Sequence, residues 1–229
     1  MRRQTLLAAF AVALTLPADS ALAAQGLTES VWRNIPEYDY APTPQDITKE
    51  QTWSAANAPA YSFLNSVDGF NYGSDNAQTI AGWFGADAAG AALNDANAPG
   101  DGYFAFDASG YIFAPVAGTY TFDLGATFNQ VDDAARVTVD GQIVAEQNFQ
   151  ATYADYSDAV YLTAGYHAFD LFYFQTQGGY GLNLTATGPT GGAVDYTTTA
   201  APEPATWAMF VIGFAGLGFA GYGRKAIAA

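Results

Sequence analysis

The chain has 229 residues, and its 22 acidic groups against 7 basic ones give a formal net charge of −15. Such an excess of carboxylates argues against a nucleic-acid partner, because phosphates need clustered Lys and Arg. The sequence has no Cys and a single His, which excludes a disulfide scaffold, a thiolate metal site and most zinc sites.

The first segment has the pattern of a secretory signal peptide. Arg2 and Arg3 precede an apolar stretch at residues 6–16, and Ala21 and Ala23 stand in an A-x-A pattern. A basic start, an apolar stretch of about ten residues and a small-residue cleavage site define an export signal. We therefore expect residues 1–23 to be a signal peptide that is removed after Ala23, and the chain to be exported.

The segment that follows shows little hydrophobic periodicity. Three prolines within residues 28–57 predict irregular structure or edge strands there. The Ala-rich residues 75–93 predict a short helix, with Ser74 or Asp75 as its N-cap.

From residue 103 onward the hydrophobic period becomes two, which is typical of half-buried strands. Asp140-Gly141 follows one alternating run and precedes another, and this dipeptide predicts a hairpin with a type I′ turn. About seven or eight such strands, with turns every 8–12 residues, predict an all-β sandwich or barrel. We expect the domain at residues 27–189 and a Thr/Gly-rich linker at residues 190–201. The alternating positions are Tyr111, Phe113, Tyr120, Phe122, Leu124, Ala135, Val137 and Val139.

Several stretches of this region resemble the protective-antigen-type domain. Residues 110–115, 117–122 and 132–141 read GYIFAP, AGTYTF and DDAARVTVDG, and residues 164–174 and 178–184 also follow the family pattern. That family is a β-sandwich found in bacterial toxins, in glycosidases and in yeast flocculin lectins. The resemblance implies an antiparallel β-sandwich of the protective-antigen/lectin type.

Asp132 and Asp133 are the residues most indicative of a binding site. Two adjacent carboxylates repel each other unless a positive charge or hydrogen-bond donors lie beside them. In the lectin branch of the protective-antigen-type family, the pair at the matching position binds Ca²⁺, and the ion holds two sugar hydroxyls. In other members of that family the pair only shapes a turn. Both interpretations, a metal site and an Asx-type turn, remain open. A calcium site also needs oxygens from a later loop, for which Gln175, Gln177 and Asn183 are candidates.

Other chemistry-bearing residues fit structural roles better than catalytic ones. His167 lies in a strand-like alternation, where we expect a partly buried, hydrogen-bonded side chain. Asp155 and Asp158 flank Tyr156 and fit either a solvated edge or a second cation site. No carboxylate spacing singles out a glycosidase pair, and no nucleophile or phosphate-binding motif is present, so a glycoside hydrolase is the weakest alternative. Trp53, Tyr72 and Trp83 are aromatics that could stack on sugar rings, although most aromatics must form the core.

The C-terminal segment has the order of parts of a membrane anchor. Pro202-Glu203-Pro204 precedes eighteen uncharged residues at 205–222, and Arg224-Lys225 follows. This length is at the short limit for a transmembrane helix with a positive-inside stop. The segment, residues 202–229, resembles a PEP-CTERM sorting signal, although its tail has fewer Arg residues than is usual. The resemblance implies cleavage near Pro202, Glu203 and Pro204 by an exosortase in the inner membrane of a Gram-negative bacterium.

Together these features predict an exported, non-catalytic module at the cell surface or in the extracellular biofilm matrix. We expect a carbohydrate or exopolysaccharide as its partner, with Ca²⁺ as a cofactor in the metal interpretation of Asp132 and Asp133. The expected route is an inner-membrane intermediate, processed by exosortase. The alternative is a scaffold protein of the exopolysaccharide matrix without a sugar pocket.

Overall fold

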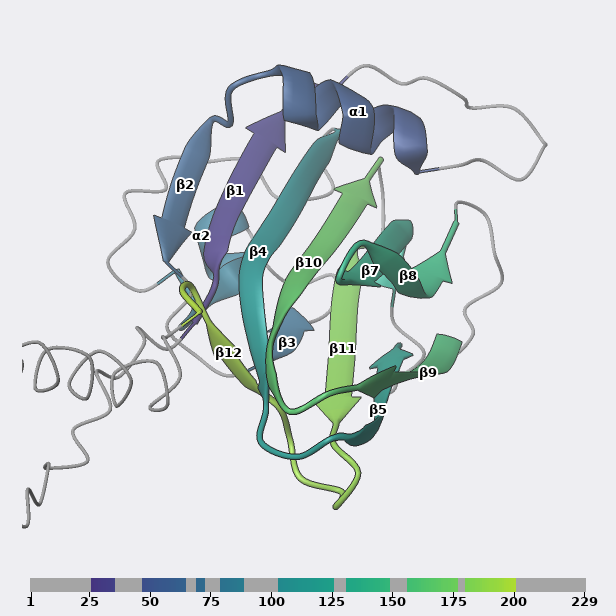
Figure 1. The fold of residues 1–229 in the computed structure, drawn as a ribbon. Helices are drawn as coiled ribbons and strands as arrows, with labels where there is room; N and C mark the ends of the chain where they lie inside the picture. Colours follow the sequence, from purple (N-terminus) through teal and green to yellow (C-terminus); the bar gives the residue numbers. More distant parts are fainter. Residues whose placement is uncertain are drawn as a thin grey trace, which may run out of the picture.

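Two antiparallel sheets pack face to face in the computed structural model (Figure 1). The structure describes residues 26–35, 47–64, 69–72, 79–88, 103–125, 131–148, 156–176 and 180–200. The predicted signal peptide, with Ala21 and Ala23, and the predicted sorting signal, with Pro202, Glu203 and Pro204, lie outside these residues. Within the described part of the chain, no helix is long and apolar enough to cross a membrane.

The larger sheet has seven strands in the order β2-β1-β4-β10-β7-β8, with β12 paired to β4. Its central pair, β4 and β10, runs in register over eleven residues, from Gly165↔Ala114 to Gln175↔Phe104. The strands are β1 (Thr28–Arg33), β2 (Tyr61–Leu64), β4 (Phe104–Ala114), β7 (Ala134–Val139), β8 (Gln142–Gln147), β10 (Gly165–Gln175) and β12 (Asp195–Thr197).

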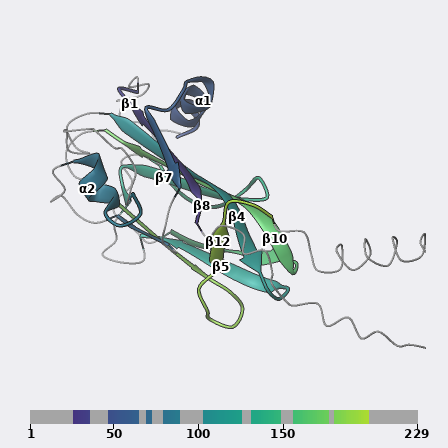
Figure 2. The same cartoon turned by 90° about the vertical axis from the view of Figure 1, so that its left-hand side faces the viewer.

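The smaller sheet has five strands in the order β3-β11-β5-β9, with β6 paired to β11. Figure 2 shows the two layers from the side; the first helix lies outside the larger sheet, whereas the second contributes Ile80, Trp83 and Phe84 to the core between the layers. The strands are β3 (Phe70–Tyr72), β5 (Gly118–Leu124), β6 (Val131–Asp132), β9 (Tyr156–Leu162) and β11 (Gly181–Thr187), and the helices are α1 (Thr48–Ala56) and α2 (Ile80–Phe84).

Alternating side chains of both sheets fill the core between the layers. The predicted alternation is confirmed on β5, where Tyr120, Phe122 and Leu124 are buried, and on β7, where Ala135, Val137 and Val139 are buried. On β4, the alternation is present, but Tyr111 and Phe113 are not on the core face. Ile112 and Ala114 face the core, whereas Tyr111 and Phe113 are only half-buried on the opposite face. The Phe113 ring lies 4.9 Å from that of Tyr166 on β10, which explains why this outer face also carries aromatics.

The Asp140-Gly141 hairpin is confirmed. Both residues have positive φ, 50° for Asp140 and 75° for Gly141, as a type I′ turn requires. The turn joins β7 to β8, and the β7–β8 register shifts between Val137 and Thr138.

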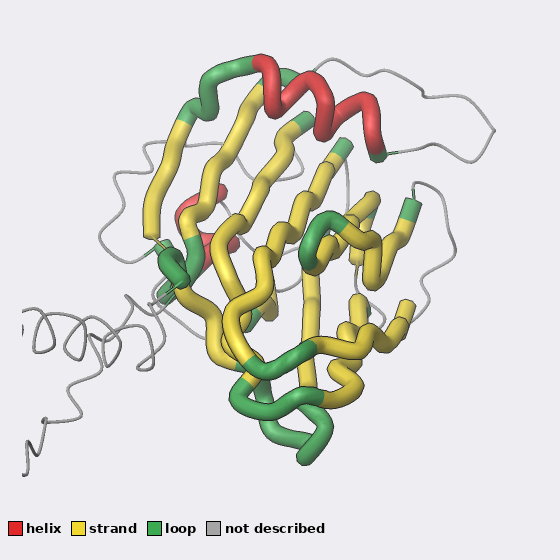
Figure 3. Tube along the Cα trace, in the orientation of Figure 1, coloured by secondary structure: helices red, strands yellow, loops and turns green. Residues whose placement is uncertain are grey.

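The N-terminal region contains more regular structure than the prolines predict. β1 is not an edge strand, because it pairs with β2 on one side and with β4 on the other. α1 follows within the same predicted irregular range and covers the outer face of the larger sheet (Figure 3). It closes a second apolar cluster formed by Trp32, Ile35, Ile47, Ala105, Ala134, Phe172 and Phe174, with Trp53 and Tyr103 packed against it.

A short helix forms in the predicted Ala-rich segment, but it is capped differently. α2 begins after Thr79, whose side-chain oxygen accepts a hydrogen bond from the backbone N–H of Gly82 at 3.0 Å. The predicted caps, Ser74 and Asp75, lie outside the described residues.

The predicted linker at residues 190–201 is wrong for its central part. Residues 195–197 form β12, which pairs with Tyr111–Phe113 of β4, and Tyr196 is buried in the core. The close approach depends on Gly110, since a Cβ there would lie 2.6 Å from the carbonyl oxygen of Thr197. A Thr/Gly-rich composition therefore did not prevent this segment from completing the sandwich.

Candidate functional site

The Asp132–Asp133 pair lies where three strands come together. Asp132 ends β6 and pairs with Gly181 of β11, while β7 begins directly after Asp133. The peptide bond between the two residues is cis. The end of β10 lies alongside, because Thr176, the residue after β10, contacts Asp133.

Thr176 holds the Asp133 carboxylate through two hydrogen bonds. Its backbone N–H and its hydroxyl both donate to Oδ2 of Asp133, each at 2.6 Å. Sequence reasoning missed this contact, because no motif connects two residues that lie 43 positions apart. The only available signal was that Thr176 directly follows a strongly alternating strand.

Buried polar side chains fix the backbone beneath the pair. The Nε2 of Gln147 donates to the carbonyl oxygen of Val131 at 2.6 Å and to that of Asp133 at 3.4 Å. The Tyr173 hydroxyl lies within hydrogen-bonding distance of the Asp132 carbonyl oxygen and of Oε1 of Gln175. These contacts come from β8 and β10, so the loop is supported from the sandwich interior.

The electrostatics of the pair suit a cation. Burial raises the pKa of the Asp133 carboxyl above its usual value, while hydrogen bonds with Thr176 and with the Asp132 side chain oppose that rise. Two carboxyl groups in hydrogen-bond contact cannot both stay ionised at low cost unless a positive charge neutralises them. Either a shared proton or a bound cation can meet that requirement.

The oxygens at the pair fit Ca²⁺ in part, and this is the ion that the resemblance to the protective-antigen-type domain implies. Carboxylate oxygens are the ligands that Ca²⁺ prefers, and Asp132 and Asp133 supply them side by side. Among the described residues, however, no group of three or more His, Cys, Asp or Glu side chains is arranged to hold a metal. Further oxygens would therefore come from elsewhere; the flanking segments 126–130 and 177–179 lie outside the described residues.

The later-loop candidates are not brought to the pair in the expected way. Gln175 is fully buried, and its Oε1 lies 2.6 Å from the Tyr173 hydroxyl. Asn183 lies within β11, where its amide donates to the carbonyl oxygen of Phe70 at 3.3 Å. Gln177 lies outside the described residues.

His167 has the structural role that its position predicted. Its Nδ1 lies 2.7 Å from Oδ2 of Asp140, and its Nε2 lies 2.9 Å from the carbonyl oxygen of Thr163. Asp140 also accepts a hydrogen bond from the backbone N–H of Ala168. His167 therefore ties the β7–β8 turn to the β9–β10 turn.

The remaining candidates are dispersed. Asp158 is exposed on β9, whereas Asp155 lies outside the described residues. Tyr72 and Trp83 are almost fully buried in the core, and Trp53 packs against the second apolar cluster beneath α1.

Residues 87–197 match the family model of the PA14 domain. This match confirms the resemblance to the protective-antigen-type domain over that part of the chain and includes β12. A search of curated proteins gave no match.

Three solved structures are similar to this chain in fold. The PA14 sugar-binding domain from an RTX adhesin has 21% sequence identity and a TM-score of 0.60, covering 79% of this chain and 99% of that one. The PA14 domain of the antifreeze protein MpAFP has 18% identity and a TM-score of 0.57, covering 77% and 88%. The Epithelial Adhesin 6 A domain from Candida glabrata, in complex with Galβ1-3GlcNAc, has 14% identity and a TM-score of 0.52, covering 79% and 90%. The fold of this chain is thus a PA14-like antiparallel β-sandwich.

Proposed function

We propose that this chain is an exported, non-catalytic module that binds carbohydrate at the edge formed by Asp132 and Asp133. The observation that carries the proposal is the contact between two adjacent carboxyl groups on a loop held from below by Gln147 and Tyr173. The fold supports it, because two structures of this fold are described as a sugar-binding domain and as a galactoside complex.

Calcium is the proposed cofactor at this edge. The carboxylates of Asp132 and Asp133 would hold the ion, and a hard cation with open coordination positions supplies binding sites for sugar hydroxyl oxygens. The residues of this chain position those carboxylates: Thr176 orients Asp133, and the Gln147 amide fixes the backbone between β6 and β7. The acidic character of the chain favours neutral rather than anionic glycans.

Calorimetric titration of the purified chain with CaCl₂ tests the cofactor. The double variant Asp132→Asn/Asp133→Asn should lose calcium binding, whereas Asp158→Asn, an exposed carboxylate on β9, should retain it. A glycan array probed in Ca²⁺ and again in EDTA then tests the ligand. Equal calcium affinity in the wild type and the double variant would contradict the metal site.

One observation favours a second candidate function. The two hydrogen bonds from Thr176 to Asp133 are also what a structural turn requires. In that case the sandwich acts as a scaffold of the exopolysaccharide matrix and has no sugar site at this edge. Absence of both calcium binding and glycan binding by the wild type would favour this candidate.

We also propose that an exosortase sorts the chain through Pro202, Glu203 and Pro204. The sequence supports an export signal ending at Ala23 and an inner-membrane intermediate anchored at residues 205–222. The experiment is expression in a Gram-negative host with and without its exosortase, followed by fractionation. Replacing Pro202, Glu203 and Pro204 by Ala should leave the chain in the inner membrane. Release of that variant at the wild-type rate would overturn the proposal.

A further inference from the structure

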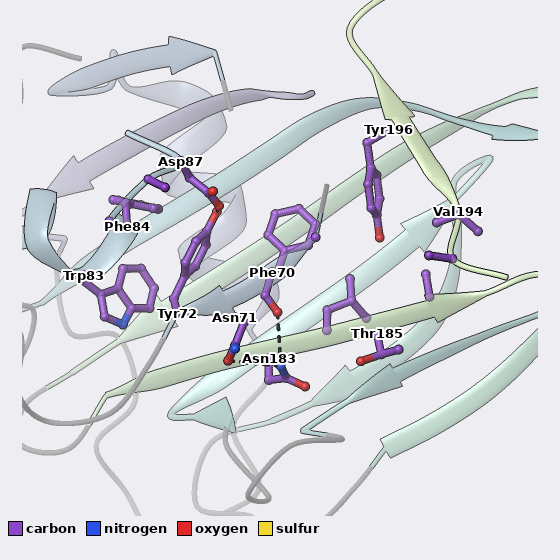
Figure 4. Close-up of a pocket in the computed structure, with 16 residues that line it drawn as sticks. Phe70, Asn71, Tyr72, Trp83, Phe84, Asp87, Asn183, Thr185, Val194 and Tyr196 are labelled. Carbon is purple, nitrogen blue, oxygen red and sulfur yellow. Dashed lines mark hydrogen bonds between the residues drawn. The ribbon is translucent and has the colours of Figure 1, made fainter. Parts of the chain in front are cut away.

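Many aromatic rings of this chain are enclosed between the two sheets. Figure 4 shows four of them, Phe70, Tyr72, Trp83 and Tyr196, and each of these residues is at most 4% exposed. Such rings hold the sandwich together and are closed to a ligand. Aromatic rings that a ligand can reach lie on a different surface of the described residues.

The outer face of the larger sheet carries such rings. Tyr111 and Phe113 of β4 and Tyr166 of β10 are half-buried there rather than enclosed. Phe113 pairs directly with Tyr166 across the two strands, and the two rings lie 4.9 Å apart. Tyr111 stands two residues before Phe113 and pairs with Ala168, which is exposed. Tyr111, Phe113 and Tyr166 together are called the outer aromatic face below.

The first helix leaves the outer aromatic face open. α1 closes the apolar cluster of Trp32, Phe172 and Phe174, which lies at the other end of the same sheet surface. In Figure 1, α1 crosses the top of the larger sheet, whereas β12 lies at its lower end beside β4. Among the described residues, no helix lies over the outer aromatic face. An uncovered group of rings on a sheet surface is a candidate for binding.

Carboxylates stand at both ends of the outer aromatic face. Asp195 of β12 pairs with Phe113 and is exposed. Asp170 of β10 pairs with Ser109, which lies four residues along β4 from Phe113. At about 3.4 Å per residue, the two acidic positions are roughly 14 Å apart along the strands. A ligand that lies along the rings therefore meets a carboxylate at each end.

This surface offers no cation to balance those carboxylates. Within the outer aromatic face and its neighbours on β4, β10 and β12, no residue on this side is Lys, Arg or His, and His167 lies on the opposite side of β10. Arg136, whose charge acts on Asp170, is itself paired with Glu146 at 2.5 Å. An anionic ligand would be repelled here, whereas a cationic ligand is complementary in charge.

Rings and carboxylates together favour a sugar that carries an amino group. Aromatic rings pack against the apolar C–H face of a pyranose ring. The face of a Tyr ring also attracts an ammonium group, and a carboxylate accepts charge-assisted hydrogen bonds from it. A neutral sugar uses only the first of these interactions, and a basic peptide has no pyranose face. An amino sugar uses all of them.

We propose that the outer aromatic face binds a cationic polysaccharide, one whose sugar units carry free amino groups, as in a chain of glucosamine units. Ammonium groups pair with Asp195 and with the acidic end at Asp170, and the pyranose faces rest on the rings between them. The inference goes beyond the proposed calcium-dependent site, since it names another surface and another class of glycan.

The two sites are far apart on the sandwich. Asp133 contacts Thr176, which directly follows β10, whereas Tyr166 is the second residue of the same strand. The ten residues between Tyr166 and Thr176 correspond to roughly 33 Å of extended chain. Substitutions at Asp132 and Asp133 should therefore leave the outer aromatic face unchanged.

The test is calorimetry of the purified chain with three probes at about pH 6 and low salt. The glucosamine tetramer should bind, and its binding should weaken severalfold when NaCl is raised from about 0.05 M to about 0.5 M. The N-acetylglucosamine tetramer, which has the same rings without the charge, and tetralysine, which has the charge without the rings, should each bind about tenfold or more weakly. The Asp132→Asn/Asp133→Asn variant should bind the glucosamine tetramer as the wild type does.

Two pairs of variants locate the binding. Asp195→Asn removes one exposed charge and should weaken binding by about threefold, whereas Asp158→Asn, an exposed carboxylate on β9, should not. Tyr166→Thr removes the ring but keeps a strand-forming residue, so it should weaken binding by about fivefold. Tyr161→Thr is its matched control, because Tyr161 is 69% exposed on β9 in the other sheet.

Several results would overturn the proposal. Equal affinities for the glucosamine and N-acetylglucosamine tetramers would mean that the amino group is not recognised, and equal affinities for the glucosamine tetramer and tetralysine would mean that the sugar is not. Equal affinities in Asp195→Asn and Asp158→Asn, at positions where folding is not at risk, would place the binding elsewhere. A wild-type dimer that Tyr166→Thr dissociates would assign the surface to a second copy of the chain. Failure of the CaCl₂ titration would count against the Asp132–Asp133 site alone.

Discussion

Asp107 and Asp170 form a carboxyl pair that should make the stability of the sandwich depend on pH. Asp107 lies on β4 opposite Phe172, and Asp170 lies two residues earlier on β10 opposite Ser109, so the two are diagonal neighbours on the outer face. Burial, the charge of Asp170 and the hydrogen bond to it raise the pKa of Asp107 to about 8. Burial also raises the pKa of Asp170, whereas the hydrogen bond from Asp107 and the charge of Arg136 lower it. The pair therefore shares one proton at neutral pH.

The sign of the effect follows from the raised pKa of Asp107. The folded state binds this proton more tightly than the unfolded chain does, so the contribution is fully present below the unfolded value of 3.8 and is lost as pH rises to about 8. Each pH unit in that window weakens folding by about 1.4 kcal/mol for a fully shifted group. Between pH 5 and pH 8 the upper limit is roughly 4 kcal/mol.

Asp107→Asn isolates this contribution. The amide can still donate a hydrogen bond to Asp170, but it has no proton to lose. Urea unfolding of both proteins at pH 5, 6, 7 and 8 should show the variant gaining up to roughly 4 kcal/mol relative to the wild type across the series. The other titrating groups are present in both proteins, so their contributions cancel in this difference. Parallel stability profiles for the two proteins would refute the shared-proton reasoning.

Three further predictions concern side chains away from the Asp132–Asp133 pair. Burial lowers the pKa of His167, but its hydrogen bonds to Asp140 and Thr163 outweigh this effect and raise the pKa above the usual 6.5. The protonated side chain therefore stabilises the folded state below pH 6.5, and this contribution is lost as pH rises through the folded pKa. The NMR titration of this single His should move toward pH 6.5 in Asp140→Asn, and an unchanged midpoint would disprove the ion pair. Gly110→Ala should lower stability by about 1–3 kcal/mol in chemical unfolding, because the added Cβ would clash with the Thr197 carbonyl oxygen and the Leu27 side chain. A variant as stable as the wild type would show that β12 can move aside without cost. Tyr72→Phe removes a hydroxyl that donates to Oε1 of Glu29 at 2.9 Å and to Oδ2 of Asp87 at 2.5 Å, so the free energy of unfolding should fall by about 1–3 kcal/mol in chemical unfolding. An equally stable variant would mean that the two carboxyl groups are satisfied without this hydroxyl.

The strands of the second half could be predicted because their signals are local. The alternation on β5 and β7 and the Asp140-Gly141 turn depend on neighbours within a few residues. Tyr111 and Phe113 misled the assignment of faces, because aromatic residues also cover the outer face of β4 against Tyr166. A period of two identifies a strand, but not which of its faces is buried.

The two ends of the domain could not be predicted for a different reason. β1 and β12 both join β4 from opposite ends of the described chain, and neither carries a strong pattern of its own. Their formation depends on the edge that β4 offers and on the missing side chain at Gly110. Such long-range pairing overrides local composition, as it does for the Thr/Gly-rich residues around β12.

The candidate site shows the same division between local and long-range signals. Asp132 and Asp133 are adjacent in the sequence, so the resemblance located them, although the Thr176 contact needed the fold. The sequence also offered Tyr72 and Trp83 as residues that could stack on sugar rings, but both are buried in the core between the sheets. An aromatic residue packs equally well in a core and against a sugar, so its type alone does not distinguish the two roles. Which role applies depends on what covers the ring, and that is decided by segments distant in the sequence.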